Sequence, residues 1–417
     1  MVSEGNALRK SIIAVIAAVL VAVLITSYAV GTLYFSPAPS SETGALNKLG
    51  TFEQGTLYQT AGEAGKFFVV NLHGSFHDMG RQYGYLLKNQ LNEFYAAATQ
   101  QLLNSNQNIT QEALNEAAKS GYQTQPNYLQ DLIRGMSETS GMPLQQQKVS
   151  ASLFGFLFGC SSIDAWGNYS TDGSVVVGRN WDTERGVFDG YAKYLTVVVY
   201  NPVGYASSIA EINYVGCVGF QSGMNSHGIF LDLQNGQLAD TAVYGERTPG
   251  AFLLFDFLLN STTLNQVDKL FQTTQPNMGL IINAANAEKA TVYEWATYDT
   301  KTRSSADGLV ASSNHFLNSS WTGLQAVPVG VHGGFSKERQ KNLMNLGEQN
   351  KGSIDAAKMM EILDTTIPNG GPTFPDDSVY ETYYHIVGVP RELTVWLKAP
   401  GYSGWEQIDL KSLFVEL

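Results

Sequence analysis

Residues 159–182, GCSSIDAWGNYSTDGSVVVGRNWD, decide the fold of this chain. The residues before them are predicted to be helical, and from residues 159–160 onward the chain takes on the character of β-strands. Within the stretch, Thr-Asp-Gly at residues 171–173 separates two apolar runs. This pattern predicts a β-hairpin, because Asp-Gly tolerates the positive φ of a tight turn. The two halves of the stretch are therefore expected to pair as antiparallel strands.

The length of the hairpin turn sets which residues face each other. If Asp172 and Gly173 form a two-residue turn, Asp182 faces Ile163. If the loop is one residue longer at its start, Asp182 faces Ser162. The sequence leaves both registers open, because a shift of one residue exchanges the two faces of a strand.

In either register, residues 179–182 lie beside Cys160. A regular strand directs Arg179 and Asp182 to opposite faces, so both reach the thiol only at a bulge or a strand end. A thiol with a neighbouring guanidinium and carboxylate suits nucleophilic catalysis, because cysteine needs a base or a positive neighbour to become a thiolate. No histidine is near Cys160 in the sequence. If the bond after Gly159 is cut, the new α-amine, with a pKa of about 7.7–8.0, can accept the thiol proton.

The residues around this stretch predict an α+β or layered α/β body with much antiparallel sheet. An apolar strand at residues 66–72 precedes a helix that begins near residue 74 and continues to about residue 103. Residues 109–158 have apolar positions at three- and four-residue spacing, which predicts helices. Further strands are predicted at residues 174–181, 193–200, 228–233, 279–283, 290–295, 382–388 and 392–399, and further helices at residues 251–261, 264–272, 337–350 and 354–364.

The N-terminus is predicted to be a membrane segment. Residues 11–35 carry no charge and, at about 1.5 Å per residue, can cross a hydrocarbon core of about 30 Å. Arg9 and Lys10 precede the segment and no basic residue follows before Lys48, so the rest of the chain is expected outside the cytoplasm. We favour an uncleaved signal anchor over a cleaved signal peptide, whose apolar core is usually shorter. Residues 36–50 are expected to be a flexible linker.

Composition excludes several classes of protein. The chain has 417 residues with 25 basic and 37 acidic side chains, a net charge of −12, which argues against a nucleic-acid partner. Hydrophobic residues make up 44%, enough to build a core. The two cysteines, Cys160 and Cys217, are too few for a disulfide scaffold or a cysteine-based metal site. The six histidines show no ligand spacing, and we expect no metal or other cofactor.

Six segments stand in order along the chain: residues 74–84 (GSFHDMGRQYG), 159–161 (GCS), 172–173 (DG), 178–182 (GRNWD), 223–228 (GMNSHG) and 313–316 (SNHF). In these segments the sequence resembles the isopenicillin-N acyltransferase family of self-cleaving N-terminal-nucleophile (Ntn) hydrolases, which are related to the choloylglycine (bile-salt and penicillin V) hydrolases. The resemblance implies a four-layer αββα sandwich, cleavage before Cys160, and activity on a non-peptidic amide or an acyl donor. It extends from about residue 67 to residue 343.

The resemblance also implies roles for single residues. Cys160 matches the nucleophile, and its freed amine matches the general base. Asp182 matches the carboxylate that holds this amine, and Arg179 matches the arginine near the thiol in the bile-salt branch. Asn235 matches a donor to the oxyanion, although Gln234 takes that place if the register shifts by one residue.

Three further residues complete the expected site. Asn314 matches a second amide near the intermediate, and such donors contribute about 2.7–4 kcal/mol each. Arg339 matches a late arginine of the family, and we expect Arg339 and Trp181 to contact substrate. Residues 161–162 are Ser-Ser where a threonine commonly follows the nucleophile, and a membrane anchor is not typical of the family. These departures leave the substrate open more than the chemistry.

The expected organisation is a cytoplasmic tip and anchor at 1–35, a linker at 36–50, a helical segment at 51–159 and a catalytic segment at 160–417. The last two are expected to pack as one body and to stay associated after cleavage. We predict a membrane-anchored, extracytoplasmic amidohydrolase or acyltransferase whose small acyl-amide substrate forms an acyl-enzyme on Cys160. Hydrolysis is favoured over transfer, because exported proteins meet little acyl-coenzyme A.

Two other functions fit the sequence. One is an ordinary cysteine peptidase that uses a remote histidine such as His315. The other is a surface binding protein that kept the fold without catalysis.

Overall fold

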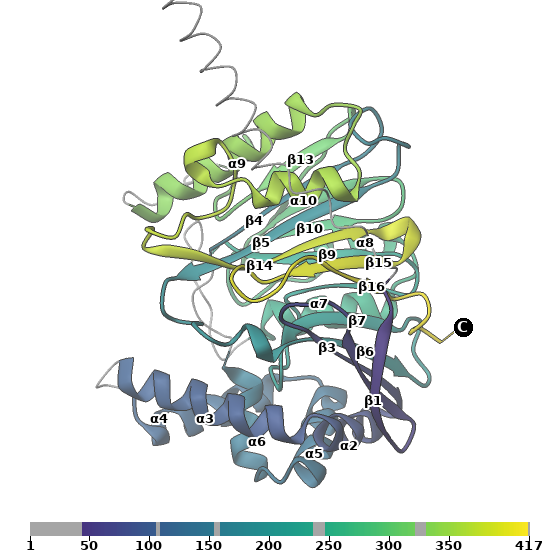
Figure 1. Ribbon diagram of the computed structural model, residues 1–417, viewed down its shortest axis with the longest axis vertical. Helices are drawn as coiled ribbons and strands as arrows, with labels where there is room; N and C mark the ends of the chain where they lie inside the picture. Colours follow the sequence, from purple (N-terminus) through teal and green to yellow (C-terminus); the bar gives the residue numbers. More distant parts are fainter. Residues whose placement is uncertain (1–43, 106–108, 154–158, 237–246, 322–330, 416–417) are drawn as a thin grey trace, which may run out of the picture. The chain divides into compact units, whose positions relative to one another are not determined.

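The computed structural model describes residues 44–105, 109–153, 159–236, 247–321 and 331–415 (Figure 1). Residues Thr43–Leu417 form one compact unit. The expected membrane segment at 11–35 lies outside the described residues. In the described ranges, no helix has both the length and the apolar character needed to cross a membrane.

The described strands form two sheets. In the ten-stranded sheet the order is β1-β2-β3-β6-β7-β8-β9-β10-β11-β12. Its strands are β1 (Leu46–Phe52), β2 (Gly55–Thr60), β3 (Phe68–Gly74), β6 (Leu195–Pro202), β7 (Ile209–Tyr214), β8 (Ser222–Asn225), β9 (Phe230–Asn235), β10 (Leu280–Ala285), β11 (Ala290–Trp295) and β12 (Thr300–Arg303).

The six-stranded sheet has the order β13-β4-β5-β14-β15-β16. Its strands are β13 (Leu309–Ser312), β4 (Gly159–Ala165), β5 (Val176–Glu184), β14 (Tyr380–Val389), β15 (Thr394–Lys398) and β16 (Glu406–Asp409). The described helices are α2 (Phe76–Leu86), α3 (Lys88–Ser105), α4 (Gln111–Thr124), α5 (Asn127–Ser140), α6 (Leu144–Ser152), α7 (Gly250–Asn260), α8 (Leu264–Thr273), α9 (Val331–Gln349) and α10 (Ala356–Asp364).

The two sheets face each other, and the side chains of β4 alternate between the space that separates the sheets and the outer face of the six-stranded sheet. Cys160 belongs to the main core, and Ser162 donates to Asp232 of the opposite sheet at 2.9 Å. Ile163 packs in a second core, with Met359 of α10. Helices α9 and α10 therefore cover the outer face of the six-stranded sheet (Figure 1).

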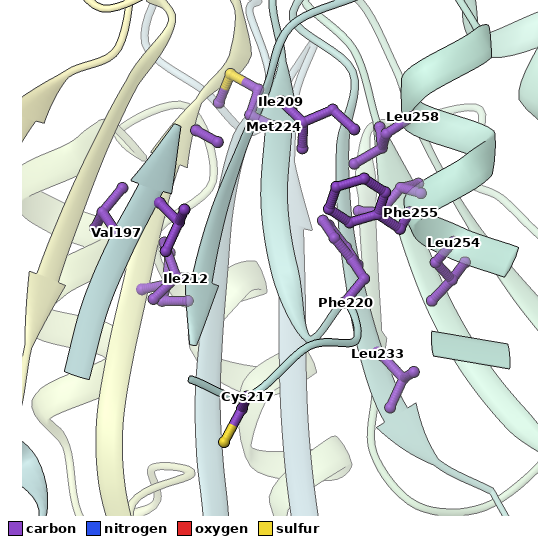
Figure 2. Packing of buried hydrophobic residues seen from close by; sticks show 14 of the residues in the cluster. Val197, Ile209, Ile212, Cys217, Phe220, Met224, Leu233, Leu254, Phe255 and Leu258 are labelled. Carbon is purple, nitrogen blue, oxygen red and sulfur yellow. The ribbon is translucent and has the colours of Figure 1, made fainter. Parts of the chain in front are cut away.

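A helical layer also covers the far face of the ten-stranded sheet. Figure 2 shows Leu254, Phe255 and Leu258 of α7 beside Ile209 and Phe220, which belong to β7 and to the loop before β8. Helix α2 packs on β3 of the same sheet. The arrangement is a layered α+β body, as the sequence predicts.

Three expected features differ from the structure. Residues 46–50, expected to end the linker, belong to β1, which pairs with β2. The strand expected at residues 66–72 corresponds to β3, but the segment 51–159 also contributes the end of β1 and all of β2 to the ten-stranded sheet. The single helix expected to reach about residue 103 is divided between α2 and α3 at Leu87.

Neither expected hairpin register is present. Asp182 pairs with Gly159, and Arg179 pairs with Ser162. Gly173 does adopt the positive φ expected of the turn, at +81°. The strands nevertheless end early, because residues 166–175 form contacts elsewhere: the Trp166 N–H donates to the carbonyl of residue 308 at 2.7 Å. A longer loop moves the whole pairing by several residues.

Candidate active site

The thiol of Cys160 lies against the guanidinium of Arg179. Cys160 is the second residue of β4 and is fully buried. Arg179 Nη2 donates to the Cys160 Sγ at 3.3 Å and to the Leu233 carbonyl at 2.7 Å. Arg179 Nη1 donates to the Gln221 carbonyl at 2.5 Å. Carbonyls from β9 and from the loop before β8 therefore hold the charged group beside the sulfur.

The Asp182 carboxylate lies on the opposite face of β5, as strand alternation requires. It is buried, and its Oδ2 accepts from Arg339 Nη1 of α9 at 2.7 Å. Its Oδ1 accepts from Thr382 Oγ1 of β14 at 2.6 Å. A Cβ added to Gly159 would lie 3.7 Å from Asp182 Cβ. The carboxylate is thus beside the backbone that precedes Cys160, while Arg179 is beside the thiol.

Asn314 contacts the same stretch of backbone. Its Oδ1 accepts from the Cys160 N–H at 3.0 Å and from Arg339 Nη2 at 2.8 Å. Its Nδ2 donates to the Asn235 carbonyl at 2.9 Å. The guanidinium of Arg339 therefore links Asp182 to Asn314, and both flank the bond between Gly159 and Cys160.

A cavity of about 460 Å³ adjoins this cluster. Gln221 and Leu233, whose carbonyls accept from Arg179, are among the residues that line it. Helices α4 and α6 contribute part of the lining, and the segments around β9, α7 and β10 contribute another part. Residues from both sides of the Gly159–Cys160 bond therefore form its wall.

The two candidates for an oxyanion donor separate by strand alternation. Asn235 lines the cavity. Gln234 Nε2 donates to Ser162 Oγ at 2.7 Å, and Gln234 Oε1 accepts from Ser312 Oγ at 2.7 Å. The Gln234 amide is thus bonded between the two sheets, which favours Asn235 for the role.

The two residues expected to contact substrate are placed differently. Neither Arg339 nor Trp181 is among the described residues that line the cavity. Arg339 is buried between Asp182 and Asn314. Trp181 is buried in an aromatic cluster, where it stacks on Tyr384 with ring centroids 5.2 Å apart. Arg339 thus bridges Asp182 and Asn314, and Trp181 packs in the hydrophobic core.

Burial dominates the ionisation of the site. It raises the pKa of the Cys160 thiol, and the positive charge of Arg179 opposes this shift. Burial also raises the pKa of Asp182 to about 6, against the lowering influence of Arg339. In the intact chain the thiol is therefore protonated at neutral pH, and a further base is needed to activate it.

His315 does not supply that base by direct contact. Its Nδ1 bonds to Ser336 Oγ at 2.7 Å and to Ser313 Oγ at 3.2 Å. Burial lowers its pKa to about 4. Among the hydrogen bonds of the described residues, no histidine nitrogen is joined to the thiol of Cys160.

Two residues of the site had no recognisable signal in the sequence. Thr382, which donates to Asp182, is 200 positions away from it along the chain. Ser336 Oγ accepts from the Asn314 N–H at 2.9 Å and so helps to orient that residue. In the described ranges, no group of three or more His, Cys, Asp or Glu side chains is arranged to hold a metal ion.

The chain matches one family by sequence. The family is described as acyl-coenzyme A:6-aminopenicillanic acid acyl-transferase, and its sequence model matches residues 169–399. The match includes Arg179, Asp182, Asn235, Asn314 and Arg339 and begins after the nucleophile candidate. A curated relative, protein dcd1B of Dictyostelium discoideum, is 25% identical over 191 residues. That alignment covers 39% of this chain and spans only 38% of the relative.

Solved structures with a similar arrangement come from several organisms. A variant of the conjugated bile acid hydrolase of Clostridium perfringens has a TM-score of 0.45 and 13% identity, covering 61% of this chain and 93% of that one. The N-acylethanolamine-hydrolyzing acid amidase ortholog of Caenorhabditis elegans has a TM-score of 0.41 and 16% identity, covering 55% of this chain and 93% of that one. Penicillin V acylase of Agrobacterium tumefaciens has a TM-score of 0.40 and 13% identity, covering 62% of this chain and 89% of that one.

Proposed function

From the premise that the chain belongs to the acyl-coenzyme A:6-aminopenicillanic acid acyl-transferase family, we propose that it is an amidohydrolase or acyltransferase that matures by cleavage between Gly159 and Cys160. The observation that carries the proposal is the contact of Arg179 with the Cys160 thiol at 3.3 Å, next to Gly159, which pairs with Asp182 across β4 and β5. A nucleophile, a cation and a carboxylate around one backbone bond suit self-cleavage followed by acyl transfer.

Maturation begins with attack of the Cys160 sulfur on the carbonyl carbon of Gly159. The new S–C bond forms as the C–N bond breaks, and the thiol proton passes to the departing nitrogen. Water then hydrolyses the thioester, which releases the Gly159 carboxylate and restores the thiol. The products are a new carboxyl end and a free α-amine on Cys160, and in this proposal the Asp182 carboxylate holds that amine.

Turnover uses the same atoms on a separate substrate. The free amine accepts the thiol proton, and the thiolate attacks the carbonyl of an acyl amide. Amide nitrogens of Asn235 and Asn314 stabilise the developing oxyanion, each by about 2.7–4 kcal/mol. The departing amine takes a proton from the Cys160 ammonium, and water or another amine then removes the acyl group from the sulfur.

Hydrolysis remains the main reaction in this proposal.

The N-terminal segment remains a proposed membrane anchor. The anchor is supported by the uncharged stretch at residues 11–35, with Arg9 and Lys10 before it. Extraction tests this part. The full chain should remain in membranes after carbonate treatment, and a chain that starts at residue 44 should not. Release of the full chain by carbonate would contradict anchoring.

Intact-mass measurement tests the maturation step. Purified wild type should give a separate fragment that starts at Cys160, and Cys160→Ala should remain a single chain. Cys217→Ala is the matched control: it also removes a buried thiol, and it should be cleaved like wild type. An uncleaved wild type with full amidase activity would eliminate the free-amine mechanism.

The peptidase alternative makes a different prediction. If His315 were the base, His315→Ala would abolish activity in a wild-type protein that is never cleaved before Cys160. A protein that is catalytically inert on a panel of acyl amides, and whose thiol does not react with iodoacetamide, would favour a binding function instead.

A further inference from the structure

The cavity lined by Gln221, Leu233 and Asn235 has a mainly apolar wall with one charged residue. Its volume of about 460 Å³ falls in the range of roughly 300–1,000 Å³ typical of small-molecule sites. Leu114 and Ala118 of α4, Val149 of α6 and Phe252 of α7 are among the apolar lining residues. Arg247 is the one lining residue, within the described part of the chain, that carries a charge.

The Arg247 guanidinium is held at the cavity by backbone carbonyls. Its Nη1 donates to the Pro276 carbonyl at 3.3 Å and also to the Thr297 carbonyl. Asn277 and Met278, the next residues after Pro276, line the cavity as well. The charged group is therefore fixed next to a lining segment.

No acidic side chain of the described residues forms an ion pair with Arg247. Arg339, by contrast, has Asp182, and Arg303 has Glu294 at 2.7 Å. A guanidinium has five N–H donors in a planar fork, and the two carbonyl bonds of Arg247 both use Nη1. The other donors suit a carboxylate, which matches this fork in shape and charge.

We propose that the substrate is an N-acyl compound that carries a carboxylate, and that Arg247 binds this carboxylate while the apolar wall holds the acyl chain. The inference rests on the proposed acyl-amide function and makes Arg247 the residue that determines specificity. The carboxylate belongs either to the amine portion, as in an N-acyl amino acid, or to the far end of the acyl chain.

Three matched substrates separate these arrangements. N-decanoylglycine has its carboxylate on the amine portion, and the monoethanolamide of decanedioic acid has it at the end of the acyl chain. N-decanoylethanolamine is the neutral reference. Wild type should prefer one of the two carboxylates over the neutral amide by about ten- to hundredfold in kcat/KM, as expected for a charge-assisted hydrogen bond.

Variants at Arg247 decide the assignment. Arg247→Gln should bring the preference close to one, mainly through KM, and Arg247→Lys should retain part of it. Arg134→Gln, which removes an exposed arginine of α5, is the control and should keep the wild-type ratio. A wild-type ratio near one, or an unchanged ratio in Arg247→Gln, would overturn the inference.

Failure of the proposed function gives a distinct result. If cleaved wild type hydrolyses none of the three amides, the amidase proposal fails for this class of substrate. Calorimetric binding of the same compounds to wild type and Arg247→Gln then decides the inference alone. Weaker binding of a carboxylate compound by the variant, about ten- to hundredfold, supports it, and equal binding by the two proteins contradicts it.

Discussion

At the scale of single residues, Arg179 determines the environment of the thiol. Its fork donates to one sulfur and to two backbone carbonyls of the facing sheet. A lysine carries the same charge as a single point on a flexible stem and cannot reproduce this fork. Geometry, and not charge alone, therefore distinguishes the two residues here.

Arg179→Lys should impair the thiol while leaving a positive charge nearby. We expect kcat/KM to fall about ten- to hundredfold, since the hydrogen bond to the sulfur and the alignment of the charge are lost. The pH at which iodoacetamide modifies Cys160 should move upward. Arg185→Lys, at an exposed arginine just after β5, is the control. An alkylation profile identical to that of wild type would contradict this role.

Asp182 should make the turnover rate fall at acidic pH. Burial raises its pKa to about 6, so the carboxylate becomes neutral as the pH falls through that value and no longer attracts the Cys160 amine. Turnover of the cleaved protein should therefore decline between pH 7 and pH 5.

Asp182→Asn should reduce the turnover rate at every pH and remove the decline below pH 7. Glu184→Gln, at the exposed end of the same strand, should keep the wild-type profile. Thermal unfolding of each variant checks that it is folded, because Asp182→Asn leaves Arg339 without its carboxylate. A wild-type turnover rate that stays flat down to pH 5 would contradict a required carboxylate that loses its charge near pH 6.

At the scale of elements, two helices of the N-terminal segment cross at glycine contacts. A Cβ added to Gly80 of α2 would lie 2.1 Å from the Leu132 carbonyl oxygen of α5. One added to Gly135 of α5 would lie 2.2 Å from the His77 carbonyl oxygen. The glycines therefore permit the backbones of the two helices to touch.

Gly80→Ala should lower the free energy of unfolding by about 1–3 kcal/mol, because backbone atoms cannot move away as a flexible side chain can. Gly121→Ala of α4 is the matched control. Its added Cβ would have its nearest neighbour at 3.7 Å, and the gain in helix propensity should raise stability by about 0.5–1 kcal/mol. Urea unfolding monitored by circular dichroism measures both. Equal effects of the two changes would refute the packing argument.

At the scale of the whole molecule, the proposed cleavage divides a shared structure. Strand β3, before the bond, lies between β2 and β6 and pairs with β6 in parallel. Helix α4, also before the bond, lines the cavity together with α7. The two fragments therefore share a sheet, a core and a cavity wall.

The cleaved fragments should remain associated in native buffer. We expect one species by size-exclusion chromatography, two bands in a denaturing gel, and separation on the column only when denaturant is added. Uncleaved Cys160→Ala should elute at the same volume and serves as the reference. Fragments that separate in native buffer would show that the shared sheet does not hold them.

Local patterns in the sequence determined several features of this protein. The change from helix to strand at residue 159, the positive φ of Gly173 and the nearness of Arg179 to Cys160 follow from periodicity and turn chemistry. Each depends on residues close together in the chain or across one hairpin. The opposite faces of Arg179 and Asp182 follow from the same strand alternation.

Only the tertiary structure decided the hairpin register, the place of Arg339 and the choice between Asn235 and Gln234. The register depends on contacts of the loop with residue 308, and Arg339 reaches Asp182 across 157 positions of sequence. Such contacts leave no periodic trace, because the partners of a buried polar group are set by how distant segments pack and not by their neighbours in the chain.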